Sequence, residues 1–173
     1  MDFAWYRKAM EKPPRQNIIE WQLLFEFLGA FFRNRGIENP IVVEIGVRTN
    51  NQKIFWEKLL DAKHIGIDIA DGYGVPDILG DSKDLKTFEA LKKALGGKRI
   101  NVLFIDGDHS YDGVKNDYEI YSPLTEDIVI FHDIHSPKYE VWKFWEEMAE
   151  KHKRPSMTIG SQTGLIILKE GKT

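Results

Sequence analysis

Five short apolar segments recur along the chain and predict buried β-strands. Each is five or six residues long, rich in β-branched residues, and apolar almost throughout. The predicted strands cover residues 41–45, 64–68, 101–106, 128–132 and 164–168, and a weaker one lies around 77–79. Continuous apolar runs are typical of strands in a parallel sheet that is covered on both faces. We therefore expect a mostly parallel sheet.

Apolar positions at helical spacing predict helices between these strands. The predicted helices cover residues 17–35, 52–60, 84–95, 111–121 and 139–152. Their inward stripes are expected to include Ile54, Phe55, Leu59 and Leu60; Leu85, Phe88, Leu91 and Leu95; and Val141, Trp142, Trp145 and Met148. Strands that alternate with helices imply right-handed crossovers. The predicted fold class is thus α/β, a doubly wound, mostly parallel sheet with an N-terminal helix.

The length of 173 residues predicts a single domain covering residues 1–173. Residues 40–170 are expected to form the α/β core, and residues 1–39 an N-terminal helical segment. The apolar helix at 17–35 follows the Pro13-Pro14 break. It could pack on the sheet or act as a lid over a site, and packing is favoured. The same helix could form the interface of a homo-oligomer.

Charge and cysteine content exclude several classes of function. The formal net charge of −3 offers no broad basic field for nucleic acid or for an anionic membrane surface. Because the chain contains no cysteine, disulfides, zinc-thiolate sites, iron-sulfur clusters and thiol nucleophiles are excluded. No apolar stretch approaches the roughly 18 to 20 residues of a membrane helix, and residues 1–12 do not resemble a signal peptide. A cytoplasmic protein is expected.

Polar residues at strand ends are the candidates for chemistry, because ligands of open α/β sheets bind beyond the carboxyl ends of the strands. The first strand ends at Glu44 and Gly46, and Asn50 or Asn51 can adopt a left-handed conformation almost as glycine does. The later glycines of a G-x-G-x-x-G dinucleotide fingerprint are missing. Asp68 follows about 20 residues after the turn, where a carboxylate could bind ribose hydroxyls or stabilise a turn.

Asp81 and Ser82 follow the weak third strand. They could reach the edge of an adenine ring. Equally, they could cap the helix that begins near residue 84, since Asp and Ser are favoured N-cap residues. Both interpretations stay open from the residues alone.

Two carboxylates and two imidazoles are expected at neighbouring strand ends. Asp106 and His109 follow the fourth strand, and His132 and Asp133 follow the fifth. Asp106 and Asp133 can hold a hard divalent cation such as Mg²⁺. His109 could then take a proton from a hydroxyl group, because its ordinary pKa of about 6.5 suits a general base. Alternatively, His132 is a buried structural histidine.

Residues near this cluster have simpler interpretations. Ser110 and Asp112 are better read as N-cap residues of the following helix than as catalytic groups. A metallohydrolase site is the least favoured use of the same Asp and His residues, because a two-metal centre needs more ligands.

Several motifs together resemble the class I S-adenosylmethionine-dependent methyltransferases. The similarity covers residues 40–168 and is closest to the metal-dependent O-methyltransferases related to the macrocin and catechol enzymes, a branch that includes cephalosporin-hydroxylase-like proteins. Its most specific part is the Asp-Gly-Asp-His-Ser-Tyr run at 106–111 with His-Asp one strand later. The matching segments are Val43-Glu44-Ile45-Gly46-Val47, Gly66-Ile67-Asp68, Gly80-Asp81-Ser82, the run 104–114 and Phe131-His132-Asp133-Ile134.

The resemblance implies a Rossmann-like methyltransferase fold and a function. An S-adenosylmethionine cofactor would transfer its methyl group to a hydroxyl of a small molecule or a sugar, assisted by Mg²⁺. The loop with Glu44 and Gly46 would pass beside the methionine part, and Asp68 would hold the ribose. The remaining implied roles are adenine contacts for Asp81 and Ser82, cofactor and metal contacts for Asp106, metal contacts for Asp133 and His132, and a catalytic pair of His109 as base with Asp106.

A second hypothesis is a binding or accessory module that keeps the fold without turnover. It is motivated by Asn50 and Asn51, which stand where the family has a glycine pair, and by the short chain. The sequence does not identify the methyl acceptor.

Overall fold

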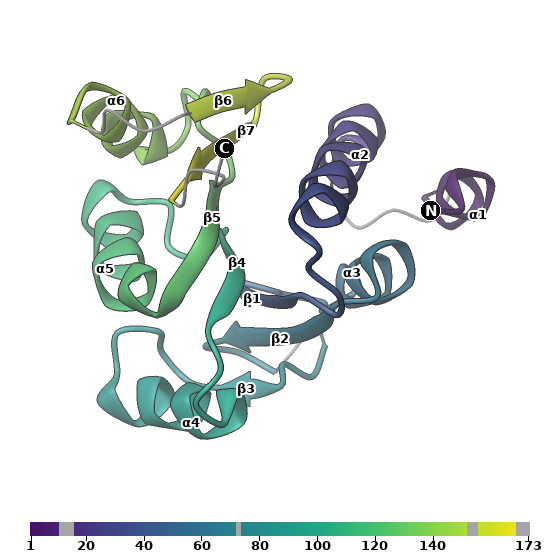
Figure 1. Cartoon of the computed structure of the whole chain (residues 1–173). Helices are drawn as coiled ribbons and strands as arrows, with labels where there is room; N and C mark the ends of the chain where they lie inside the picture. Colours follow the sequence, from purple (N-terminus) through teal and green to yellow (C-terminus); the bar gives the residue numbers. More distant parts are fainter. Residues whose placement is uncertain (11–15, 72–73, 152–155, 169–173) are drawn as a thin grey trace.

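The computed structural model describes residues 1–10, 16–71, 74–151 and 156–168. Within these residues, seven strands form one sheet in the order β3-β2-β1-β4-β5-β7-β6 (Figure 1). The strands are β1 (Ile41–Ile45), β2 (Lys63–Asp68), β3 (Ile78–Leu79), β4 (Ile100–Ile105), β5 (Thr125–Phe131), β6 (Ser156–Ile159) and β7 (Thr163–Ile167). Strands β1 to β5 pair in parallel, so the predicted doubly wound, mostly parallel α/β fold is confirmed.

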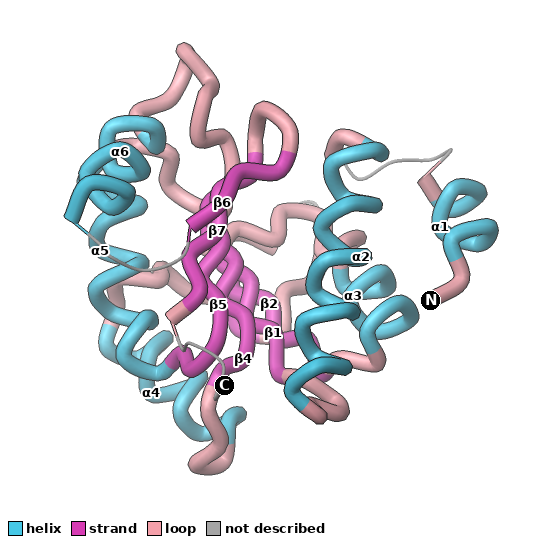
Figure 2. The backbone as a smooth tube through the Cα atoms, turned by 45° about the horizontal axis from the view of Figure 1, so that its top comes forward, coloured by secondary structure: helices cyan, strands magenta, loops and turns pink. Residues whose placement is uncertain are grey.

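Helices cover both faces of the sheet (Figure 2). They are α1 (Phe3–Ala9), α2 (Ile18–Arg35), α3 (Lys53–Leu60), α4 (Leu85–Leu95), α5 (Tyr111–Tyr121) and α6 (Val141–Lys151), with a short 3₁₀ turn η1 (Ser122–Leu124). Alternate residues of β1 point to opposite faces. Val43 packs in the core with α4, α5 and α6, whereas Val42 packs with α1, α2 and α3.

The C-terminal edge of the sheet is its antiparallel part. The apolar run of β7 is typical of a parallel strand, but β7 pairs antiparallel with β5 and with β6. Only the three residues 160–162 separate β6 from β7, whereas a parallel connection needs a crossover of about a dozen residues. Strand β6 was not predicted because three of its four residues are exposed, which leaves no apolar run to detect.

Two predicted inward positions face solvent. Ile54 is 44% exposed and Leu85 is 72% exposed, because both lie in the first turn of their helices. Trp142, also expected to face inward, is half-buried. The other members of these stripes are buried or packed against the core, so only the helix starts depart from the expected pattern.

The N-terminal helix α2 packs on the sheet. Trp21 and Phe25 are buried and contact Trp56 with ring centroids 5.8 and 5.0 Å apart. The buried carboxylate of Glu20 accepts a 2.8 Å hydrogen bond from the backbone N–H of Ser161, which joins α2 to the β6–β7 turn. Packing of this helix is therefore confirmed, while Pro13 and Pro14 lie outside the described residues.

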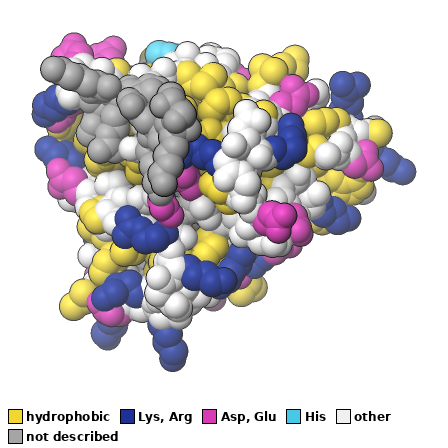
Figure 3. Space-filling model, in the orientation of Figure 1, with side chains coloured by type: hydrophobic (Ala, Val, Ile, Leu, Met, Phe, Trp, Pro, Cys, Tyr) yellow, Lys and Arg dark blue, Asp and Glu magenta, His cyan; other side chains and the backbone are white. Residues whose placement is uncertain are grey.

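On the surface seen in Figure 3, basic and acidic side chains are interspersed with apolar ones. Among the described residues, no helix is both long and apolar enough to span a membrane.

Candidate active site

A cavity of about 360 Å³ lies beyond the carboxyl ends of strands β1 to β4. The strand order reverses between β1 and β4, and this is the position where open α/β sheets bind ligands. Its lining includes Gly46 after β1, Asp68 at the end of β2, Ser82 after β3, and Asp106 and His109 after β4. The topology thus brings together residues that are far apart in the sequence.

Gly46 allows the backbone after β1 to approach the backbone after β4 closely. Its φ of +88° lies in the left-handed region, and its N–H donates a 2.9 Å hydrogen bond to the carbonyl of Ile67. A Cβ atom at this position would lie 2.2 Å from the carbonyl oxygen of Asp106. Because the neighbouring atoms belong to the backbone, only glycine fits here without displacement.

Asp68 holds the turn after β1. Its Oδ2 accepts a 2.7 Å hydrogen bond from the N–H of Arg48, and its Oδ1 accepts a 2.9 Å bond from the N–H of Ala70. The turn role predicted as one alternative is therefore present. A carboxylate keeps further lone pairs beyond these two bonds, so a ribose contact stays a prediction. The left-handed conformation expected of Asn50 or Asn51 occurs at Asn50, with a φ of +52°.

Glu44 does not reach the cavity. Its side chain is fully buried and accepts a 2.9 Å hydrogen bond from the indole N–H of Trp56, while Nε2 of His64 lies 2.9 Å from the same oxygen. Glu44 has the same parity in β1 as Val42, so it points toward the α1–α3 side of the sheet. The structure therefore places Glu44 in the core, apart from the cofactor contacts inferred for it.

The wall formed by residues 80–83 has its own hydrogen bonds. Asp81 Oδ1 accepts a 2.9 Å bond from the N–H of Lys83, and the Lys83 ammonium donates to Asp108 Oδ2 at 2.9 Å. Ser82 Oγ donates to Asp117 Oδ1 at 2.6 Å. The N-cap of α4 is Asp84, so neither Asp81 nor Ser82 has the alternative role of capping that helix. By contrast, Ser110 caps α5 as predicted.

Asp117 was missed by the sequence reasoning. Asp117 lies in the middle of α5 and is fully buried. Burial raises the pKa of its carboxyl to about 6, although the hydrogen bond from Ser82 acts in the opposite direction. A signal was present in the sequence, since Val114, Asp117 and Tyr121 follow each other at helical spacing on the buried face. A carboxylate on such a face needs a partner.

Replacement of Asp117 by asparagine is expected to stabilise the fold in a pH-dependent way. The folded-state pKa of about 6 exceeds the ordinary 3.8, so the buried carboxylate costs roughly 3 kcal/mol once it is ionised. Stability of the native protein should therefore fall as the pH rises from about 4 to 6. Urea unfolding should show Asp117→Asn to be more stable by about 1–3 kcal/mol at pH 8 and unchanged at pH 4. An equal effect at both pH values would contradict this explanation.

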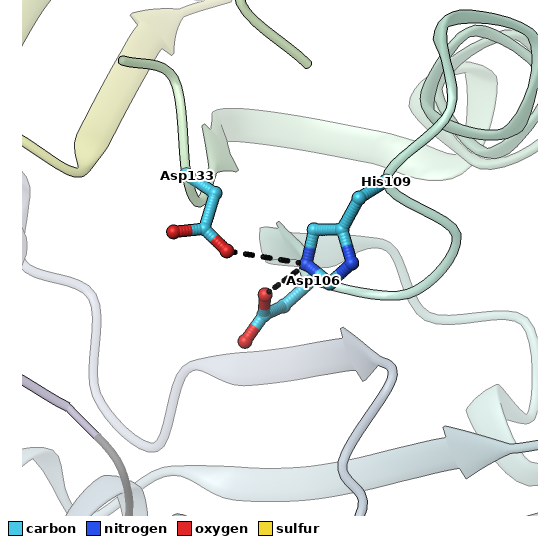
Figure 4. Close-up of side chains that lie close together, drawn as sticks. All are labelled: Asp106, His109 and Asp133. Carbon is cyan, nitrogen blue, oxygen red and sulfur yellow. Dashed lines mark hydrogen bonds and ion pairs between the residues drawn. The ribbon is translucent and has the colours of Figure 1, made fainter. Parts of the chain in front are cut away.

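Asp106, His109 and Asp133 converge at the end of the cavity (Figure 4). Nε2 of His109 lies 3.1 Å from Asp106 Oδ1 and 3.4 Å from Asp133 Oδ2. Each of the three residues offers one potential metal-ligand atom, and these three atoms lie within 4.8 Å of one another. Asp133 has a φ of +60°, which residues other than glycine seldom adopt. Such strained backbone conformations often occur at functional sites.

His132 lies beside the same carboxylates. Its Nδ1 is 3.3 Å from Asp106 Oδ1 and 3.6 Å from Asp133 Oδ2. Burial lowers the pKa of His132, but the two carboxylates outweigh burial and raise it to about 10. Burial likewise opposes ionisation of Asp106, yet His132 and His109 bring its pKa to about 2. The hydrogen bond to Asp106 raises the pKa of His109. Positive charge is therefore strongly favoured between these carboxylates.

Two further residues border this cluster. The ring of Tyr139 stacks on His109 with centroids 4.2 Å apart and an interplanar angle of 18°. The Gln16 amide lies 3.4 Å from Asp106 Oδ2, at the outer limit of a hydrogen bond. Neither residue was singled out from the sequence. Both lie far from Asp106 in the sequence, and no local motif marks them.

Part of this chain is similar in sequence to known proteins. Residues 74–134 match the model of a methyltransferase domain family. An uncharacterized protein of Sinorhizobium fredii, y4gI, is 34% identical over 91 residues, which is 50% of this chain and 10% of that protein. The chain thus spans about a tenth of that curated relative.

Solved structures confirm the predicted methyltransferase fold. MycE methyltransferase in complex with Mg and S-adenosylhomocysteine superposes with a TM-score of 0.68 at 13% identity, covering 93% of this chain and 53% of MycE. The O-methyltransferase TomG from Streptomyces achromogenes in complex with S-adenosylmethionine gives a TM-score of 0.64 at 14% identity, covering 96% and 89%. A putative caffeoyl-CoA O-methyltransferase from Staphylococcus aureus gives 0.63 at 15%, covering 96% and 92%. These likenesses confirm the fold that the resemblance in the sequence implies, and the family match at residues 74–134 agrees with it.

Proposed function

We propose that this chain binds S-adenosylmethionine in the cavity and transfers its methyl group to a hydroxyl of a small molecule. The main support for the proposal is that the cavity and the acid-imidazole cluster share two residues. Asp106 and His109 line the cavity, and the same two residues form the acid-imidazole cluster with Asp133. A cofactor in the cavity would therefore end beside groups able to activate a hydroxyl.

The strand order suggests how the cofactor lies. Its sulfonium end would be near Gly46 and Asp106, where β1 and β4 meet, and its ribose would be near Asp68 on β2. The adenine would then extend toward Asp81 and Ser82, which follow β3 on the far side of β2. The cavity volume of about 360 Å³ is within the range of small-molecule sites.

The cluster fits a hard divalent cation. Two carboxylates with an adjacent imidazole match the preference of Mg²⁺ for few protein ligands and retained water. His132 Nδ1 is buried and has no hydrogen-bond partner among the described residues, despite lying close to both carboxylates. Asp106 and Asp133 would hold the cation, with His132 as its neighbour. When bound, the cation would lower the pKa of a substrate hydroxyl.

His109 is proposed as the general base. The hydroxyl proton would pass to an imidazole nitrogen of neutral His109, and the oxygen would attack the methyl carbon as the carbon–sulfur bond breaks. S-adenosylhomocysteine would leave with a neutral sulfur, because the electron pair of the broken carbon–sulfur bond would stay on that atom. Stacking on Tyr139 restricts the orientation of the His109 ring, which would help to position it for proton transfer.

Calorimetric titration with S-adenosylhomocysteine tests the cofactor part of the proposal. We expect binding by the intact chain and a loss of roughly 10- to 100-fold in affinity for Asp68→Ala, because a charged ribose contact contributes about 1.5–3 kcal/mol. The variant Asp112→Ala is the control, since Asp112 is exposed on α5 outside the cavity. Its affinity should match that of the unmodified protein. Absence of binding with and without Mg²⁺ would overturn the proposed function.

A further inference from the structure

Ser82 has a single hydroxyl hydrogen, which it donates to Asp117 in a hydrogen bond. The Ser82 Oγ lies 2.6 Å from Asp117 Oδ1, and an ionised carboxylate can only accept hydrogen bonds. The hydrogen must therefore point from Ser82 into the protein. Since Ser82 also lines the cavity, its oxygen can offer only lone pairs to a ligand.

Neighbouring contacts hold Ser82 in this arrangement. The hydroxyl of Tyr121 donates a 2.6 Å hydrogen bond to the backbone carbonyl of Ser82, one helical turn after Asp117 on α5. On the other side, the ion pair of Lys83 with Asp108 joins this wall to the loop after β4. The backbone of this segment is thus held from both sides, and the hydrogen bond to Asp117 sets the direction of the Ser82 hydroxyl.

Asp117 is well suited to set the direction of this hydrogen bond. It is fully buried, and its Oδ2 has no hydrogen-bond partner among the described residues. The charged groups that act on it are Lys83, Asp108 and Asp81. A buried carboxylate that is only partly satisfied costs stability, and such a cost is tolerated where a group serves a site.

We infer that Asp117 is a positioning residue that fixes the Ser82 hydroxyl as a hydrogen-bond acceptor, so that this end of the cavity selects a base carrying an amino group over one carrying a carbonyl. The inference rests on the proposed function, which places the adenine beside Ser82. An amino group would donate to Ser82 Oγ. A carbonyl at the same place would face lone pairs and leave a polar group unpaired, and an unpaired polar group in a binding site weakens the binding of that ligand.

The test compares S-adenosylhomocysteine with S-inosylhomocysteine, in which a carbonyl replaces the adenine amine. Calorimetry at pH 7.5 should show that the unmodified protein prefers S-adenosylhomocysteine by at least about tenfold. Asp117→Leu removes the acceptor and frees the Ser82 hydrogen to point into the cavity. It should reduce the preference about tenfold, chiefly through tighter binding of the inosine compound.

Two variants show whether Asp117 acts through Ser82. Ser82→Ala should also reduce the preference, and adding Asp117→Leu to it should cause no further change in the ratio of affinities. The matched control Asp112→Asn on the exposed side of α5 should retain the full preference.

The outcomes separate this inference from the proposed function. If Asp117→Leu weakens both compounds equally, or leaves the ratio unchanged, Asp117 is only a structural residue and the inference is wrong, while cofactor binding stands. If the unmodified protein binds neither compound, the proposed function fails and the inference fails with it.

Discussion

Replacement of Asp106 by asparagine is expected to weaken Mn²⁺ binding on the order of 100-fold. Asp106 supplies one of two carboxylates in the cluster, and its side chain is only 12% exposed, so solvent compensates little for the lost charge. Removing one partner of a buried charged pair commonly costs about 2–5 kcal/mol. Electron paramagnetic resonance of free Mn²⁺ during titration would measure the affinity without knowledge of the methyl acceptor.

Asp112→Asn provides the control for this measurement. It removes one carboxylate from the same segment of the chain, but Asp112 is exposed in the first turn of α5 and outside the cluster. The Mn²⁺ affinity of this variant should equal that of the unmodified protein. Equal weakening in both variants would mean that Mn²⁺ responds to overall charge, and the assignment of a metal centre would be wrong.

Gly46→Ala is expected to destabilise the fold by about 3–5 kcal/mol and to abolish cofactor binding. Two costs add at this position. A φ of +88° strains any residue with a Cβ, and that Cβ would lie 2.2 Å from the carbonyl oxygen of Asp106. Relief requires β1 and β4 to separate where the cavity begins. Urea unfolding and calorimetry with S-adenosylhomocysteine would measure the two effects.

Gly97→Ala is the control that separates the cost of backbone strain from the cost of a steric clash. Gly97 has a similar φ of +83°, but a Cβ there would meet no atom within 4 Å. This variant should cost only about 1–2 kcal/mol and should leave cofactor affinity unchanged. If both substitutions cost the same free energy of unfolding, the close approach between Gly46 and Asp106 does not determine the effect.

The sequence predicted the central strands and the helices well because their signals are local. Strand β1 was predicted with its observed bounds, since four of its five residues are apolar and Glu44 is the one exception. The antiparallel pairing of β6 and β7 was not predictable in the same way. Its direction depends on a three-residue connection and on an exposed edge strand, and neither leaves an apolar pattern.

The candidate site was predictable where it follows strand ends. Asp106 and Asp133 come after neighbouring parallel strands, so topology alone brings them to one edge. Glu44 shows the limit of that reasoning, because a residue within a strand points to one face or the other and its parity decides where it lies. Asp117 and Tyr139 reach the site only through tertiary packing of α5 and of the loop after β5.

A crystal structure of the chain with S-adenosylhomocysteine and Mn²⁺ tests the central claim most directly. We expect the ribose hydroxyls within hydrogen-bond distance of Asp68, the adenine amine beside Ser82, and an anomalous Mn²⁺ peak between Asp106 and Asp133. A nucleoside bound elsewhere, or a Mn²⁺ peak away from these two carboxylates with the cofactor in place, would contradict the account.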